Sequence, residues 1–144
     1  MLLTVLGCSG SVPGPESPAS GYLVRAGNTS VVLDLGNGTF GMLQRYLDPF
    51  ALDGIILSHL HPDHCADISA LTVYRRYHSH QPPCDVLPVY GPPDTAERLI
   101  AAYAPNADER NRTDLSDLYA FQPYGGGTAR IGPLGVLATR VEHP

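Results

Sequence analysis

Apolar residues recur along the chain with two different periods, and these periods predict alternating strands and helices. Short apolar or alternating runs predict strands over Leu2–Gly7, 21–25, 30–35, 54–57, 86–90 and 134–142, with another starting at Tyr119. Apolar residues three or four apart predict helices over 39–47 and 66–78, and a third that Asp94 caps, with Glu97 in the position of a capping box. Segment 106–117 is polar and predicts irregular or short helical structure. This order indicates a layered α/β (α+β) sheet protein.

The segment that follows the apolar run 55–57 carries the strongest chemical signal. It reads Ser58-His59-Leu60-His61-Pro62-Asp63-His64. Histidine accounts for 6 of 144 residues, and half of the histidines lie here. Imidazole and carboxylate donors at the end of a buried strand are typical of a metal site. The alternative, a solvated loop that happens to be rich in histidine, does not account for this order of residues or for the strand before it.

The spacing of these side chains predicts how they divide between metal ions. His59 and His61 are two residues apart, so on an extended or turning backbone they point to the same side. A helix can begin at Pro62, which places Asp63 at its N-cap or in its first turn. We therefore expect one ion on His59 and His61 and a second on Asp63 and His64. Two adjacent ions would clamp the attacking and leaving oxygens of a displacement and generate hydroxide at neutral pH.

The pattern His59-x-His61-x-Asp63-His64 resembles the signature of the metallo-β-lactamase-fold hydrolases. Residues 6–11 resemble that family's first strand and glycine loop, and residues 32–36 resemble its strand that ends in an aspartate. Within the family, the chain is similar to the phosphodiesterase branch that includes ribonuclease Z. Residues 10–23 and 75–78 look closest to actinobacterial cyclic-nucleotide phosphodiesterase-like proteins. The resemblance implies an αββα sandwich, with residues 1–144 as the N-terminal part of a single domain truncated at the third metal motif.

The resemblance implies a set of metal ligands and also shows which are missing. The implied ligands are His59, His61, Asp63, His64 and, after the last strand, His143. The family completes its site with a later bridging aspartate and a later histidine, and neither can be located before Pro144. We therefore expect an N-terminal half with little or no turnover by itself; the alternative is a natural short protein with a degraded site. Two divalent ions are expected, zinc first, and manganese or iron also suit these ligands.

Other residues are candidates for roles around the metals. Asp63 would accept a proton as well as bind metal. Asp34 would hydrogen bond to the loop and orient the ligands, or would simply form a turn. A substrate would be approached through the backbone and hydroxyl groups of Ser9, Gly10 and Ser11, for which a plain tight turn is the alternative.

Composition limits the classes of function. Hydrophobic residues make up 43% and charged residues 16% of the chain, as in a globular protein. The formal net charge of −5 gives no overall footprint for nucleic acid, and residues 13–18 lack the basic residues that ribonuclease Z usually carries there. No apolar run approaches membrane-spanning length. The three scattered cysteines imply no disulfide framework, so a cytoplasmic location is expected.

These observations predict a metal-dependent phosphodiesterase that acts on a small-molecule phosphodiester, a 3′,5′-cyclic nucleotide on resemblance alone. A ribonuclease Z-like tRNA 3′-processing endonuclease is the first alternative, and a lactamase or thioester hydrolase stays open because the family shares its metal motif. The alternative from another class is a non-catalytic metal-binding domain whose unpaired sheet face self-associates, for example as a homodimer. A reading frame that continues past Pro144 into a later aspartate and histidine would exclude it.

Overall fold

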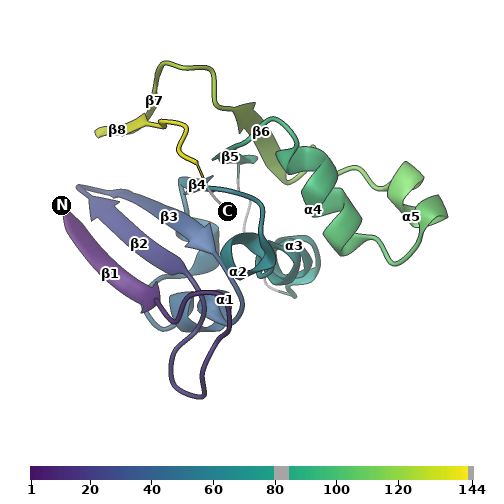
Figure 1. Cartoon of the computed structure of the whole chain (residues 1–144), viewed down its shortest axis with the longest axis horizontal. Coiled ribbons are helices and arrows are strands. Elements are labelled where there is room, and N and C mark those ends of the chain that lie inside the picture. Colours follow the sequence, from purple (N-terminus) through teal and green to yellow (C-terminus); the bar gives the residue numbers. More distant parts are fainter. Residues whose placement is uncertain (80–84, 143–144) are drawn as a thin grey trace.

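The computed structural model describes residues 1–79 and 85–142 and contains one large sheet with helices packed on one face (Figure 1). The sheet has the order β1-β2-β3-β4-β5-β6, and its strands are β1 (Leu2–Gly7), β2 (Gly21–Ala26), β3 (Thr29–Leu35), β4 (Gly54–Ile56), β5 (Leu87–Gly91) and β6 (Tyr119–Pro123). β1, β2 and β3 pair antiparallel, whereas β3, β4, β5 and β6 pair in parallel. The carboxyl ends of β3, β4, β5 and β6 therefore lie at one edge of the sheet, together with that of β1.

The helices and a separate hairpin complete the fold. The helices are α1 (Thr39–Leu43), the 3-10 turn η1 (Pro49–Ala51), α2 (Pro62–Cys65), α3 (Ile68–Tyr77), α4 (Thr95–Tyr103) and α5 (Ala107–Arg112). The hairpin consists of β7 (Thr128–Ile131) and β8 (Leu134–Leu137). This arrangement confirms the mixed α/β architecture predicted above. Within the described residues, no helix has the length and apolar character needed to cross a membrane.

The main core lies between the sheet and helices α1 to α4. Leu23, Val32, Ile55 and Val89 are neighbours in register across β2 to β5 and are fully buried on this face. The helices contribute the apolar side chains that cover them, among them Phe40, Leu43, Ile68, Leu71 and Leu99. Every residue of β4 is buried, which explains why this strand reads as a continuous apolar run rather than an alternating one.

The opposite face of the sheet is covered at one end only. Ile131 of the β7–β8 hairpin packs against Val31 and Ile56 in a second, smaller core. Near the β1 edge, on the same face, Leu3 is 59% exposed and Val5 is 52% exposed. The sheet thus presents an apolar surface beyond the hairpin.

Most predicted elements are confirmed to within one or two residues, but two predicted ends are wrong. The helix predicted over 39–47 ends at Leu43, and Arg45 and Tyr46 form tighter turns by donating to carbonyls three residues back. The strand predicted over 134–142 ends at Leu137. Leu137 pairs with Thr128, the first residue of β7, and the glycines at 125–127 before it do not extend the strand, so the ladder stops there.

The predicted capping box at α4 is also wrong in its hydrogen bonds. Asp94 is the N-cap residue, but its side chain makes no capping bond. Its backbone is close to helical (φ −86°, ψ 12°), whereas a side-chain cap requires an extended N-cap residue. Thr95 instead donates from its hydroxyl to the Pro92 carbonyl at 2.7 Å. In the polar segment 106–117, Asn106 does cap α5, accepting from the Glu109 amide at 2.9 Å.

Candidate metal centre

Residues 58–64, which we call the histidine loop, leave the carboxyl end of β4 and enter α2. Pro62 occupies the first turn of α2, where its missing N–H needs no partner, and Asp63 lies in the same turn, as predicted. β3 and β4 are parallel neighbours, so the end of β3 that carries Asp34 lies beside the start of the loop. Ser58 and His61 are exposed and the other acidic and histidine side chains are partly so, which leaves the loop open to ligands.

The buried carboxylate of Asp34 binds the histidine loop at two of its residues. The residue is 4% exposed, and its carboxylate accepts hydrogen bonds from the Ser58 amide at 2.7 Å and the Ser58 hydroxyl at 2.8 Å. It also contacts Nδ1 of His64 at 2.7 Å. The residue has a φ of 58°, a left-handed conformation that costs an aspartate about 1 kcal/mol and persists where surrounding bonds enforce it. A simple turn-forming role does not need these three bonds, so the geometry favours orientation of the loop.

These bonds also assign the tautomers of two histidines. Because the Ser58 hydroxyl donates to Asp34, its oxygen is left to accept from Nδ1–H of His59, at 3.0 Å. Nδ1 of His64 likewise donates to Asp34. In both rings Nε2 is therefore the nitrogen that carries the lone pair, the form in which imidazole binds a metal ion. A partner on one ring nitrogen that directs the other toward a metal is the usual arrangement in metal sites.

The available donor atoms form two pairs. Nε2 of His59 lies 3.1 Å from Nδ1 of His61, and Nε2 of His64 lies 3.3 Å from an Asp63 carboxylate oxygen. Two ligands on one tetrahedral zinc ion, each at about 2.0–2.1 Å, lie about 3.3 Å apart. Each pair therefore has the separation of two ligands on one ion, and the donor set fits divalent metals.

The described residues supply pairs and no larger group. Across residues 1–79 and 85–142, no three histidine, cysteine or acidic side chains are arranged to hold one ion. His143, the predicted further ligand, lies outside the described residues. Metal ligation by the histidine loop thus remains a prediction that rests on donor chemistry and spacing.

The residues predicted to approach a substrate are partly engaged in their own loop. The Ser9 amide and hydroxyl both donate to the Pro18 carbonyl, at 3.2 and 2.8 Å. Gly10 has a φ of 73°, which suits a tight turn, and Ser11 is exposed. These contacts favour the turn alternative for Ser9 and Gly10.

Three side chains that carried no assigned role bind backbone carbonyls of the histidine loop or of Leu57, the residue before it. Cys65, which is 2% exposed, donates its thiol to the carbonyls of Leu60 and His61, at 3.5 and 3.4 Å. Burial raises the pKa of this thiol above its usual value, so it stays a donor. Arg98 of α4 donates to the Leu60 carbonyl at 3.2 Å, and Tyr124 donates to the Leu57 carbonyl at 2.8 Å. Arg98 and Tyr124 are distant in sequence, and no local pattern marks them.

Comparison with known proteins identifies the family to which the chain is similar. Residues 14–83 match the model of the Metallo-beta-lactamase superfamily. An uncharacterized protein of Mycobacterium tuberculosis is 46% identical over 144 residues, which cover 99% of this chain and 51% of that protein. A ribonuclease Z of Mycolicibacterium paratuberculosis is 36% identical over 104 residues, 69% of this chain and 36% of that enzyme. The chain spans about half the length of the curated relatives that it matches from end to end.

A solved structure of one relative shares the fold. YhfI of Bacillus subtilis, a probable metallo-hydrolase, is 37% identical over 92 residues, 63% of this chain and 38% of that protein. Its crystal structure matches with a TM-score of 0.79 and 27% identity, over 99% of this chain and 54% of that chain. Together, the family model, the relatives and the fold show that this chain belongs to the metallo-β-lactamase superfamily, a family of metal-dependent hydrolases.

Proposed function

We propose that the chain carries the metal-binding part of a phosphodiesterase that hydrolyses 3′,5′-cyclic nucleotides. The observation that supports this most is the presence of two donor pairs, with separations of 3.1 and 3.3 Å, in one exposed loop. Two neighbouring ions are a recurrent arrangement for in-line displacement at phosphorus, because they polarise a phosphoryl oxygen and lower the pKa of water. The cyclic-nucleotide substrate rests on the resemblance of residues 10–23 and 75–78 described above.

In this proposal the ligands of the loop are divided between two metal ions. His59 and His61 hold one ion, and Asp63 and His64 hold the other. Ser58 and Asp34 bind Nδ1 of His59 and of His64, which directs each ring to use Nε2 as its metal ligand. Asp63, whose side chain is 17% exposed, also accepts a proton from water near the ions.

A ribonuclease Z-like activity is the second candidate, favoured by the 36% identity to the mycobacterial ribonuclease Z. Two features count against it. The formal net charge is −5, and the loop of residues 13–18 contains no basic side chain to attract an RNA backbone. Both activities use the same metal chemistry, so the substrate is what distinguishes them.

The first test is metal content by elemental analysis on the purified chain. We expect about two zinc ions per chain in the wild type, falling toward one in Asp63→Ala/His64→Ala, because the two pairs bind separate ions. Asp108→Ala, on the exposed α5 helix, is the control for loss of an unrelated carboxylate and should leave the metal content unchanged. Equal metal content in the wild type and the double variant would exclude the second ion.

The second test compares substrates on the metal-loaded chain. Radiolabelled cyclic AMP and a precursor tRNA are incubated with excess protein, because slow turnover is expected without the later ligands of the family. Cleavage of cyclic AMP that is lost in Asp63→Ala supports the proposal. Cleavage of the tRNA alone would replace it with the ribonuclease Z-like function.

A further inference from the structure

The histidine loop leaves the sheet through one peptide group that is held on both sides. The carbonyl of Leu57 accepts from the Tyr124 hydroxyl at 2.8 Å. The amide of Ser58, which belongs to the same peptide group, donates to Asp34 at 2.7 Å. A peptide group is planar, so holding its oxygen and its nitrogen fixes the orientation of the whole plane. The Cα of Ser58, from which the chain proceeds to His59, is then held in place as well.

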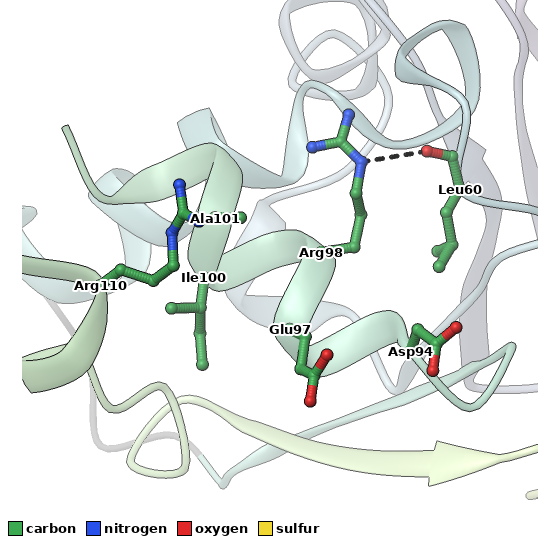
Figure 2. A pocket seen from close by; sticks show the side chains of 7 residues that line it. All are labelled: Leu60, Asp94, Glu97, Arg98, Ile100, Ala101 and Arg110. Atoms are coloured by element: carbon green, nitrogen blue, oxygen red, sulfur yellow. Dashed lines mark hydrogen bonds between the residues drawn. The ribbon is translucent and has the colours of Figure 1, made fainter. Parts of the chain in front are cut away.

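A second set of hydrogen bonds restrains the backbone between His59 and His61, the two histidines of the first pair. The Leu60 carbonyl accepts from Nε of Arg98 at 3.2 Å and from the Cys65 thiol at 3.5 Å. Figure 2 shows Arg98 extending from α4 to this carbonyl. Leu60 lies between His59 and His61, so a shift of its carbonyl would change the separation of their nitrogens.

Arg98 also lines a hollow of about 630 Å³ between α4, α5 and the loop, and Arg110 lines its other side (Figure 2). Among the described residues, no carboxylate forms an ion pair with either guanidinium. Arg98 is partly buried and is bonded to the loop, whereas Arg110 is exposed and is not. The same hollow therefore offers two arginines that differ in their contact with the loop.

The Tyr124 hydroxyl keeps its proton and so stays a hydrogen-bond donor. It follows β6, and its amide donates to the Gly91 carbonyl at the end of β5, which places its ring at the edge of the sheet where the loop begins. Burial, with the nearby Asp34 carboxylate, raises the pKa of its hydroxyl to about 12. The proton is therefore present throughout the neutral range.

We propose that Tyr124 and Arg98 are positioning residues, which hold the histidine loop in the shape that binds metal ions. The inference rests on the proposed function, because it takes the loop to be the metal site. Both residues lie beyond residues 14–83, the stretch that matches the family model, and both act on backbone carbonyls rather than on substrate. Removing either bond leaves every ligand in place but lets the loop sample other shapes.

The test measures metal affinity by titrating the metal-free chain with Co²⁺ and following its visible absorption. We expect Tyr124→Phe and Arg98→Met each to weaken Co²⁺ binding about 10-fold or more, which is typical when a group that orients ligands is lost. The controls are Tyr46→Phe, an exposed tyrosine, and Arg110→Met, in the same hollow. Both controls should bind Co²⁺ as the wild type does.

Thermal unfolding of the metal-free variants separates positioning from a structural role. Lower melting temperatures with unchanged Co²⁺ affinity and spectrum would overturn the proposal and leave Tyr124 and Arg98 as ordinary stabilising residues. An Arg98→Met affinity equal to that of Arg110→Met would likewise overturn the part that concerns Arg98. If the wild-type chain bound no Co²⁺ at all, the proposed function itself would fail, and that result is distinct from either of these.

Discussion

Replacement of Gly36 by alanine is expected to displace the second half of the histidine loop. Gly36 follows β3, and a Cβ atom on it would lie 2.5 Å from the carbonyl carbon of Asp63 and closer still to the carbonyl oxygen. It would also lie 3.1 Å from the Cβ of Ala19. Non-bonded carbon atoms prefer about 3.5–4.0 Å, so the Asp63 backbone must move by more than about 1 Å.

The cost of that movement has two parts. The Asp63 carbonyl accepts from the Ser20 amide at 3.1 Å, and loss of this bond costs about 1 kcal/mol. Overpacking against a fixed backbone typically costs about 1–3 kcal/mol. We therefore expect Gly36→Ala to lower the free energy of unfolding by about 2–4 kcal/mol, a large share of the roughly 5–15 kcal/mol of an ordinary domain. The Asp63–His64 metal pair should be displaced with the backbone.

Urea unfolding followed by circular dichroism, with zinc content measured on the same samples, checks both effects. Gly41→Ala is the matched control, because a Cβ there meets nothing within 4 Å. Gly41 lies inside α1, where alanine favours helix by up to about 1 kcal/mol over glycine, so this variant should be as stable as the wild type or more so. An unchanged urea midpoint and full zinc content in Gly36→Ala would refute the close approach of β3 to the loop.

Three further predictions concern pH and association. Burial raises the pKa of Asp67 above 3.8, so the folded state keeps a proton that the unfolded chain releases. The stability of the wild type should therefore fall as the pH rises from 3.8 through the pKa of the folded state. Urea unfolding at several pH values should show this fall in the wild type and not in Asp67→Asn. Burial raises the pKa of Tyr119 to about 12. Tyr119→Phe loses the hydrogen bond to Thr72 and should lower the free energy of unfolding by about 1 kcal/mol at neutral pH. The loss should shrink between pH 10 and 12, where the unfolded wild type ionises first, and a difference that stayed constant would contradict this. The exposed apolar side chains of Leu3 and Val5 predict concentration-dependent association in light scattering, which Leu3→Lys/Val5→Lys should reduce.

Local sequence was sufficient to predict an element where that element's own residues determine its bounds. The strand Leu2–Gly7 has the predicted bounds, and a helix begins at Pro62 as predicted. Local sequence was insufficient where the end of an element or its cap depends on a neighbouring strand or on the backbone conformation. The last strand ends at Leu137 because β7 is short, and the Asp94 side chain fails to cap α4 because its backbone is nearly helical.

The candidate site divides in the same way. Identity and spacing in residues 58–64 predict which donor atoms are present and how they pair, because these residues are adjacent in the chain and enter one helix. The tautomers and the orientation of the loop depend instead on Asp34, Arg98 and Tyr124, which lie 24, 38 and 67 positions from the residues they bind. Those contacts form only when β3 lies beside β4 and β6 lies two strands further in register, and a pattern of neighbouring residues carries no information about such pairing.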